Sequence, residues 1–243
     1  TSGANTITGG DGADTITGGG GADIIYAGAG NDTVIINASN ISSLTTAGKL
    51  IDGGAGIDTL TIGADASTLD LSKSTVQANV KNFEKIDLGS DTVVNTVILN
   101  ASAVQSLATQ YLDGSSGNKQ LIIDGASSDV VKLSGQYNNG LSAGSWTQSN
   151  TTPTRTVGGV GYKVYTLSNL SGVEVLVNNA IGTIDSNYAM ASGDIITLPT
   201  VGGIVGDVES TATGGSTGSG DGGSQQPATL SSTTSDTSPL VQG

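Results

Sequence analysis

The chain has 243 residues, of which 38 are Gly, and it contains neither Cys nor His. The missing His excludes Ser-His-Asp and Cys-His catalysis and most zinc sites, and the missing Cys excludes disulfides. The 21 acidic residues against 8 basic residues give a formal net charge of −13, which disfavours binding to nucleic acid or to an anionic membrane surface. No run of 18 apolar residues is present, so we expect no membrane insertion.

The acidic residues are of unequal kinds, with 18 Asp and only 3 Glu. Asp favours turns and is a hard-cation ligand, whereas Glu is the better helix former. This bias is compatible with acidic turns that hold Ca²⁺. An acidic, salt-tolerant surface explains the composition equally well.

A nine-residue repeat opens the chain. Its full copies are GGDGADTIT at 9–17, GGGGADIIY at 18–26 and AGAGNDTVI at 27–35, while residues 3–8 form a partial copy and GGAGIDTLT at 53–61 a detached one. The pattern is G-G-x-G-x-D-x-U-x, where U is a large aliphatic residue. This segment resembles the RTX, or haemolysin-type, calcium-binding family.

The repeat predicts glycine-rich turns that alternate with short strands, and two units then close one coil of 18 residues. Residues 18 apart stack, so Ile7 lies on Ile25 and Ile16 on Val34. In the same register Asn5 lies under Asp23, and Asp14 under Asp32. Stacked carboxylates repel each other unless a cation lies between them.

The resemblance implies that several Ca²⁺ ions lie between successive turns, bound by side-chain and turn carbonyl oxygens. The candidate ligand residues are Asn5, Gly9, Gly10, Asp11, Gly12, Asp14, Gly18, Gly20, Asp23, Gly28, Gly30, Asp32, Gly54, Gly56 and Asp58. A calcium-free glycine-rich solenoid is the alternative. Four aliphatic side chains cannot offset the ordering of about 36 residues, at about 1–2 kcal/mol of backbone entropy each.

The two sides of the predicted roll are unequal, because Asn5 stands where the other turns carry Asp. On the Asp14/Asp32 side, Asp58 follows Asp32 by 26 residues instead of 18. Asp58 continues this side only if the extra residues within 36–50 loop out. Asn37 and Asn40 lie in this stretch and each begins an N-x-S sequence, which we interpret as a turn-compatible coincidence.

Beyond the repeats, alternating patterns predict β-strands. They cover Thr59–Ile62, Thr68–Leu71, Val80–Leu88, Val93–Leu99, Gln120–Asp124, Val130–Leu133, Tyr162–Leu167 and Val173–Val177. Ser102 with Gln105 resembles a capping box and predicts a short helix over Ala103–Thr109. The fold class is therefore all-β, with a calcium-binding parallel β-roll continuing into an irregular β-solenoid or a β-sandwich.

Two weaker signals concern other functions. Trp146, Tyr162 and Tyr165 fit either a core or a sugar-stacking platform, and the core is the interpretation that we favour. Lys81, Lys85 and Arg155 are candidate bases of a calcium-dependent polysaccharide lyase, but no spacing supports that role. We therefore expect a protein that is not an enzyme.

Residues of about 50–180, including NVKNFEKIDLGSDTVVNTVILNASAVQSLA and LIIDGASSDVVKLSG, resemble the segment beside RTX repeats in large Gram-negative surface adhesins. This resemblance implies type I secretion. We expect a roll at 1–62, a β-rich adhesin-type domain at 63–200 and a flexible Gly/Ser/Thr-rich linker or tail at 201–243. Because the first residues already lie in a repeat, we expect a longer parent protein.

The function expected is a calcium-dependent structural module of a secreted or cell-surface bacterial protein, such as an RTX adhesin or a surface-layer or fibre component. Beside calcium, the expected partners are copies of the chain itself or a cell-surface or matrix polysaccharide. The alternative is a non-catalytic accessory module of an exported lipase, protease or alginate epimerase.

Overall fold

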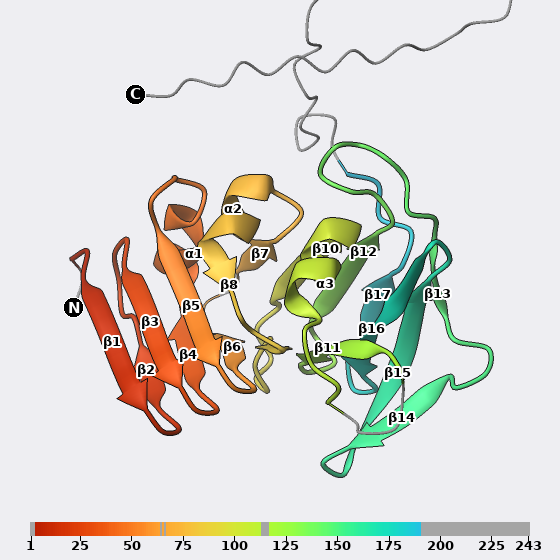
Figure 1. The fold of residues 1–243 in the computed structure, drawn as a ribbon, viewed down its shortest axis with the longest axis horizontal. Helices are drawn as coiled ribbons and strands as arrows, with labels where there is room; N and C mark the ends of the chain where they lie inside the picture. The colour runs from red at the N-terminus through yellow and green to blue at the C-terminus, as the bar shows by residue number, and fades with distance from the viewer. Residues whose placement is uncertain (1–2, 64, 66, 113–116, 191–243) are drawn as a thin grey trace, which may run out of the picture. The chain divides into compact units, whose positions relative to one another are not determined.

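The computed structural model describes residues 3–63, 65, 67–112 and 117–190, and the expected tail at 201–243 lies outside them. The described residues are mostly β, with parallel sheets and three short helices (Figure 1). They belong to one compact unit. None of their helices is long and apolar enough to cross a membrane.

The strands form three sheets. Sheet A consists of the parallel strands β1 (Thr6–Asp11), β3 (Ile24–Ala29), β5 (Leu50–Ala55) and β8 (Val80–Lys81). Sheet C consists of the parallel strands β7 (Thr68–Asp70), β10 (Thr96–Asn100), β12 (Val130–Ser134) and β17 (Thr183–Asp185).

Sheet B begins with six parallel strands and ends with antiparallel ones. The parallel strands are β2 (Thr15–Thr17), β4 (Thr33–Ile36), β6 (Thr59–Ile62), β9 (Lys85–Asp87), β11 (Lys119–Asp124) and β16 (Leu170–Asn178). The antiparallel strands are β15 (Val160–Leu167), β13 (Trp146–Gln148) and β14 (Thr154–Val157). The sheet runs across residue 62, where we expect the roll to end.

From β1 to β12, consecutive strands lie in different sheets, and each pairs in parallel with strands further along or further back in the chain. Ile7 pairs with Ile25 and Ile16 with Val34, so the predicted 18-residue register is confirmed. The next step is longer, because Val34 pairs with Leu60, 26 residues further along the chain. In Figure 1, β1, β3 and β5 run side by side at the N-terminal end of the sheets.

The extra residues between β4 and β5 contain helix α1 (Ala38–Ser43), which the sequence patterns did not predict. Helix α2 (Ser74–Asn79) leads into β8. Helix α3 (Ala101–Leu107) begins two residues before the predicted helix. The predicted cap at Ser102 is wrong, since the Asn100 side chain accepts a hydrogen bond from the Ala103 amide at 2.8 Å.

Two strand predictions also need correction. The predicted strand over Val80–Leu88 is divided into β8 and β9, because Asn82 has a φ of 57° and turns the chain from sheet A to sheet B. The predicted strand over Val93–Leu99 begins only at Thr96. The residue before it, Asn95, is buried and uses its side chain to join neighbouring coils.

The main apolar core extends from Ile16 to Ile181 and has residues from all three sheets, and Tyr162 packs with Ile122 and Leu176 in a second, smaller cluster. Trp146 is 1 % exposed and donates its indole N–H to the Ser134 carbonyl at 3.1 Å. Tyr162 and Tyr165 are also buried, and burial raises the pKa of both phenols. The core interpretation of these aromatic residues is therefore confirmed, and a sugar-stacking platform is excluded.

Leu60 on β6 is fully buried in this core and gives a direct test of the packing. We expect Leu60→Ala to lower the free energy of unfolding by about 2–5 kcal/mol, because it removes buried methyl groups and leaves a cavity. The measurement is chemical denaturation in saturating calcium. Val94 is 51 % exposed, so Val94→Ala is the matched control and should change stability by less than about 0.5 kcal/mol. Equal losses for the two variants would contradict the assigned core.

Candidate metal centre

Three glycine-rich turns lie one above another where the chain passes from sheet A to sheet B. We call these turns, residues 9–14, 27–32 and 53–58, the acidic stack. Their backbones are in register, with Gly10 paired to Gly28 and Gly28 to Gly54. Each turn ends on an aspartate, so the parallel register carries the Asp14, Asp32 and Asp58 side chains into one column.

Hydrogen bonds join the column from coil to coil. The Asp14 amide donates to Asp32 Oδ1 at 2.8 Å, and the Asp32 amide donates to Asp58 Oδ1 at 2.7 Å. The predicted stacking of Asp14 on Asp32 is confirmed. Asp58 also continues this side, because α1 takes up extra residues between the coils.

The second carboxylate oxygen of each residue has no partner. Oδ2 of Asp14, of Asp32 and of Asp58 is buried without a hydrogen bond. Among the described residues, no Lys or Arg forms an ion pair with any of the three. A buried carboxylate oxygen without a donor or a cation is strongly destabilising, so the column is electrostatically incomplete.

The buried position of Asp58 affects the pKa of its carboxyl group. Burial raises the pKa of its carboxyl group from 3.8 to about 6, and the nearby carboxylates of Asp32, Glu84 and Asp52 add to the increase. The Asp32 amide opposes the shift by donating a hydrogen bond to the ionised form. A cation beside Asp58 would favour the charged form and reverse the shift.

The glycines allow the turns to approach each other closely. Gly28 has a φ of 119°, and a Cβ atom there would lie 2.0 Å from the Gly10 carbonyl oxygen. Gly54 repeats this contact one coil later, with a φ of 95° and a distance of 1.9 Å to the Gly28 carbonyl oxygen. Main-chain carbonyls therefore border the gaps between successive turns.

This donor set fits Ca²⁺, which takes six to eight oxygens from carboxylates and carbonyls. In the described part of the chain, no three acidic side chains gather in a metal-binding group. An ion between two turns would therefore combine a stacked pair of carboxylates with turn carbonyls. Asp14, Asp32 and Asp58 would hold it through the unpaired Oδ2 atoms, and its charge would satisfy them.

The remaining predicted ligands lie in or beside the same turns. Gly9, Gly10, Asp11, Gly12, Gly28, Gly30, Gly54 and Gly56 belong to the acidic stack, and Gly18, Gly20 and Asp23 belong to a turn at the other edge of the sheets. Asp11 is exposed at the end of β1. The Asn5 amide donates to Asp23 Oδ1 at 2.8 Å, which confirms that Asn5 stacks under Asp23.

Sequence reasoning missed one member of the column. The Asp58 amide donates to Oε2 of Glu84 at 3.0 Å, and the Thr109 hydroxyl donates to Glu84 Oε1 at 2.6 Å. Glu84 therefore follows Asp58 as the last side chain of the column, and both of its carboxylate oxygens accept hydrogen bonds. The available signal was the spacing, because Glu84 follows Asp58 by 26 residues just as Asp58 follows Asp32.

A second ladder uses the same contacts without an unpaired carboxylate oxygen. The Ser67 amide donates to Asn95 Oδ1 at 3.0 Å, and the Asn95 amide donates to Asp129 Oδ1 at 2.9 Å. The other oxygen of Asp129 accepts from the Ala126 amide at 2.7 Å. The unpaired carboxylate oxygens therefore distinguish the acidic stack from this second ladder.

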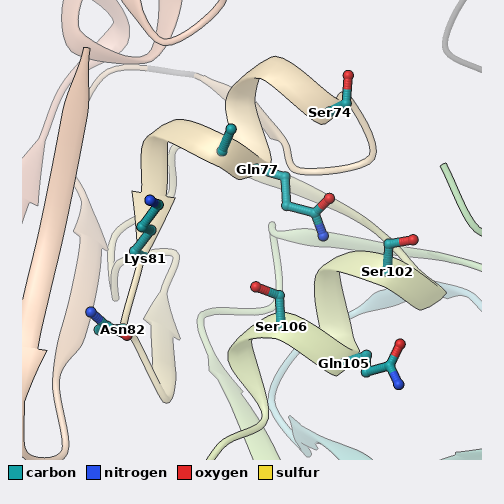
Figure 2. A pocket seen from close by; sticks show the side chains of 8 residues that line it. Ser74, Gln77, Lys81, Asn82, Ser102, Gln105 and Ser106 are labelled. Carbon is teal, nitrogen blue, oxygen red and sulfur yellow. The ribbon is translucent and has the colours of Figure 1, made fainter. Parts of the chain in front are cut away.

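The other candidate groups, Lys81, Lys85 and Arg155, lie on three different strands. Arg155 forms an ion pair with the buried Glu174, while Lys81 and Lys85 lie on strands of different sheets. A groove of about 500 Å³ separates α2 from α3 (Figure 2). Its lining has neither a carboxylate nor an aromatic ring and consists of Ser74, Gln77, Ala78, Lys81, Asn82, Ser102, Gln105 and Ser106.

Removing one carboxylate from the acidic stack should weaken calcium binding. We expect Asp14→Ala and Asp32→Ala each to lower the affinity at least roughly tenfold, equivalent to about 1.4 kcal/mol, because each change removes a charged ligand. Asp65 is exposed, so Asp65→Ala is the control for loss of one negative charge. Calorimetric titration measures all three variants, and equal losses would refute the assignment.

Calcium affinity should also fall on acidification from pH 7 to pH 5. The pKa of Asp58 is about 6, so a proton competes with calcium for its carboxylate below this pH. Above pH 6 the group is charged and available to the ion. We expect Asp58→Asn to show a smaller loss of affinity than the unaltered chain over this range. An identical pH dependence in the two proteins would contradict a role for Asp58.

Comparison with known proteins is consistent with this geometry. Residues 1–34 match the family described as RTX calcium-binding nonapeptide repeat (4 copies). A search of curated proteins gives no match, and neither comparison supports the adhesin resemblance of about residues 50–180. Residues 1–34, which include Asp14, Asp23 and Asp32, are RTX calcium-binding nonapeptide repeats.

Proposed function

We propose that this chain is a calcium-gated structural module of a secreted bacterial protein. The observation that carries the proposal is the column of buried, unpaired Oδ2 atoms on Asp14, Asp32 and Asp58. The RTX match at residues 1–34 supports calcium as the ligand and type I secretion as the export route. In this proposal the N-terminal coils are a β-roll that calcium closes, and the later coils form an irregular β-solenoid.

The gating follows from electrostatics. Without calcium, stacking the turns would bring buried carboxylates together with no counter-charge, so the N-terminal coils stay unfolded where free calcium is scarce. Outside the cell, each ion neutralises a pair of carboxylates and connects two turns. An ion that binds only the folded state adds about 2.7 kcal/mol of stability when its concentration is one hundred times its Kd.

We further propose that the module has a mechanical and not a catalytic role. A structural role suits a chain without His, in which Arg155 is engaged by Glu174. Placement in an adhesin, surface layer or fibre rests on the sequence resemblance of residues 50–180 alone. Copies of the chain or a surface polysaccharide are the partners that such a role implies.

The test is circular dichroism of the whole chain during calcium titration. We expect β signal to rise on addition of calcium and to revert toward coil with excess chelator, because the ion binds only stacked turns. Mg²⁺ at the same concentration should have little effect, since it prefers a small octahedral site. An unchanged spectrum in excess chelator would refute calcium gating.

A matched variant separates specific binding from a general salt effect. Asp14→Asn/Asp32→Asn/Asp58→Asn keeps the shape and the Oδ1 acceptors but removes the three charges, so it should lose the response to calcium. An Asn carbonyl can coordinate Ca²⁺, but it lacks the negative charge of the carboxylate that attracts the ion. A variant that responded like the unaltered chain would place the ions elsewhere.

A further inference from the structure

The aspartates at the two edges of the sheets differ in whether their Oδ2 atoms have a hydrogen-bond partner. At the edge opposite the acidic stack, residues 18–23 form a turn that we call the opposite turn, and its aspartate, Asp23, is 2 % exposed. Asp23 Oδ2 is not an unpaired atom, although it occupies the same repeat position as the unpaired oxygens of Asp14 and Asp32. Its partner comes from α1, which follows β4 where another glycine turn would continue the repeat.

The first residues of α1 are held by a reciprocal cap. Asn37 is the N-cap, and its Oδ1 atom accepts from the Ser39 and Asn40 amides at 3.0 and 3.1 Å. The hydrogen bonding is reciprocal, because the Oδ1 atom of Asn40 accepts a hydrogen bond from the Asn37 amide at 3.1 Å. Because both carboxamide oxygens face the helix, both NH₂ groups are directed toward the opposite turn.

These NH₂ groups contact oxygens of the kind that bind calcium in RTX turns. Asn37 Nδ2 donates to the Gly19 carbonyl at 2.8 Å. Asn40 Nδ2 donates to the Gly21 carbonyl at 3.1 Å and to Asp23 Oδ2 at 3.0 Å. Asn40 is 1 % exposed, so these contacts are made away from water.

We propose that the Asn37 and Asn40 amides replace a calcium ion and end the ion column above the opposite turn. The inference rests on the proposed calcium function, because it explains where that binding stops. An NH₂ group presents partial positive charge to two carbonyls and a carboxylate, as an ion would, but chelation cannot remove it. Calcium would then continue past the second coil only along the acidic stack.

The test is to restore a ligand at the cap. Asn40→Asp replaces the NH₂ group by an oxygen of similar size and places a carboxylate beside Asp23 Oδ2. We expect the variant to bind one more calcium ion per chain, measured by equilibrium dialysis of the whole chain at saturating calcium. An unchanged stoichiometry in the folded variant would overturn the proposal.

Asn37→Asp provides a second route if Asn40→Asp does not fold. Asp caps helices about as well as Asn, so this variant keeps the cap while turning an oxygen toward the Gly19 carbonyl. It too should gain one ion, and no gain would count against the proposal. The control is Asn139→Asp, which adds the same charge at an exposed turn and should leave the stoichiometry unchanged.

The outcomes separate this inference from the proposed function. If the unaltered chain binds no calcium, the calcium function fails. If it binds calcium and neither aspartate variant gains an ion, only the amide cap fails. A gain in the Asn139→Asp control as large as in Asn40→Asp would also overturn the cap, because added charge alone would then explain the effect.

Discussion

Parallel strands in register place equivalent residues of successive coils directly over one another, and this constraint governs the N-terminal part of the molecule. The shared register places aliphatic residues such as Ile16 and Val34 in contact in the core. The same register also places Asp14, Asp32 and Asp58 next to one another. The strands cannot change register to separate the charges without exposing the aliphatic residues. In the proposed function, a cation between the turns reconciles the two requirements.

The balance between ions and apolar packing changes along the chain. The N-terminal strands bury aliphatic residues such as Ile25 and Val34, whereas the later part of the chain also buries the aromatic residues Phe83 and Trp146. The pairing of the carboxylates also changes along the chain, since both oxygens of Glu84 and both oxygens of Asp129 accept hydrogen bonds from protein groups. Among the described residues, the buried carboxylate oxygens without a partner are therefore confined to the three turns of the acidic stack.

The sequence allowed the register of the repeats to be predicted, because a strict period fixes which residues stack. The pairs Asn5/Asp23 and Asp14/Asp32 followed from that period. Glu84 and the Asn37/Asn40 cap did not, because insertions break the nine-residue period before those residues are reached. Capping was also ambiguous, since Asn100 and Ser102 are both good caps and only the end of β10 selects Asn100.

Along both ladders, from Asp14 to Glu84 and from Ser67 to Asp129, the hydrogen bonds point the same way along the chain. In each case the amide belongs to the earlier coil and the acceptor side chain to the later one, from Asn5 and Asp23 to Asn95 and Asp129. The charge that holds a coil is therefore carried by its successor. Each ladder therefore has a polarity along the chain: its first residue supplies an amide donor and no side-chain acceptor, whereas an interior residue such as Asp32 supplies both.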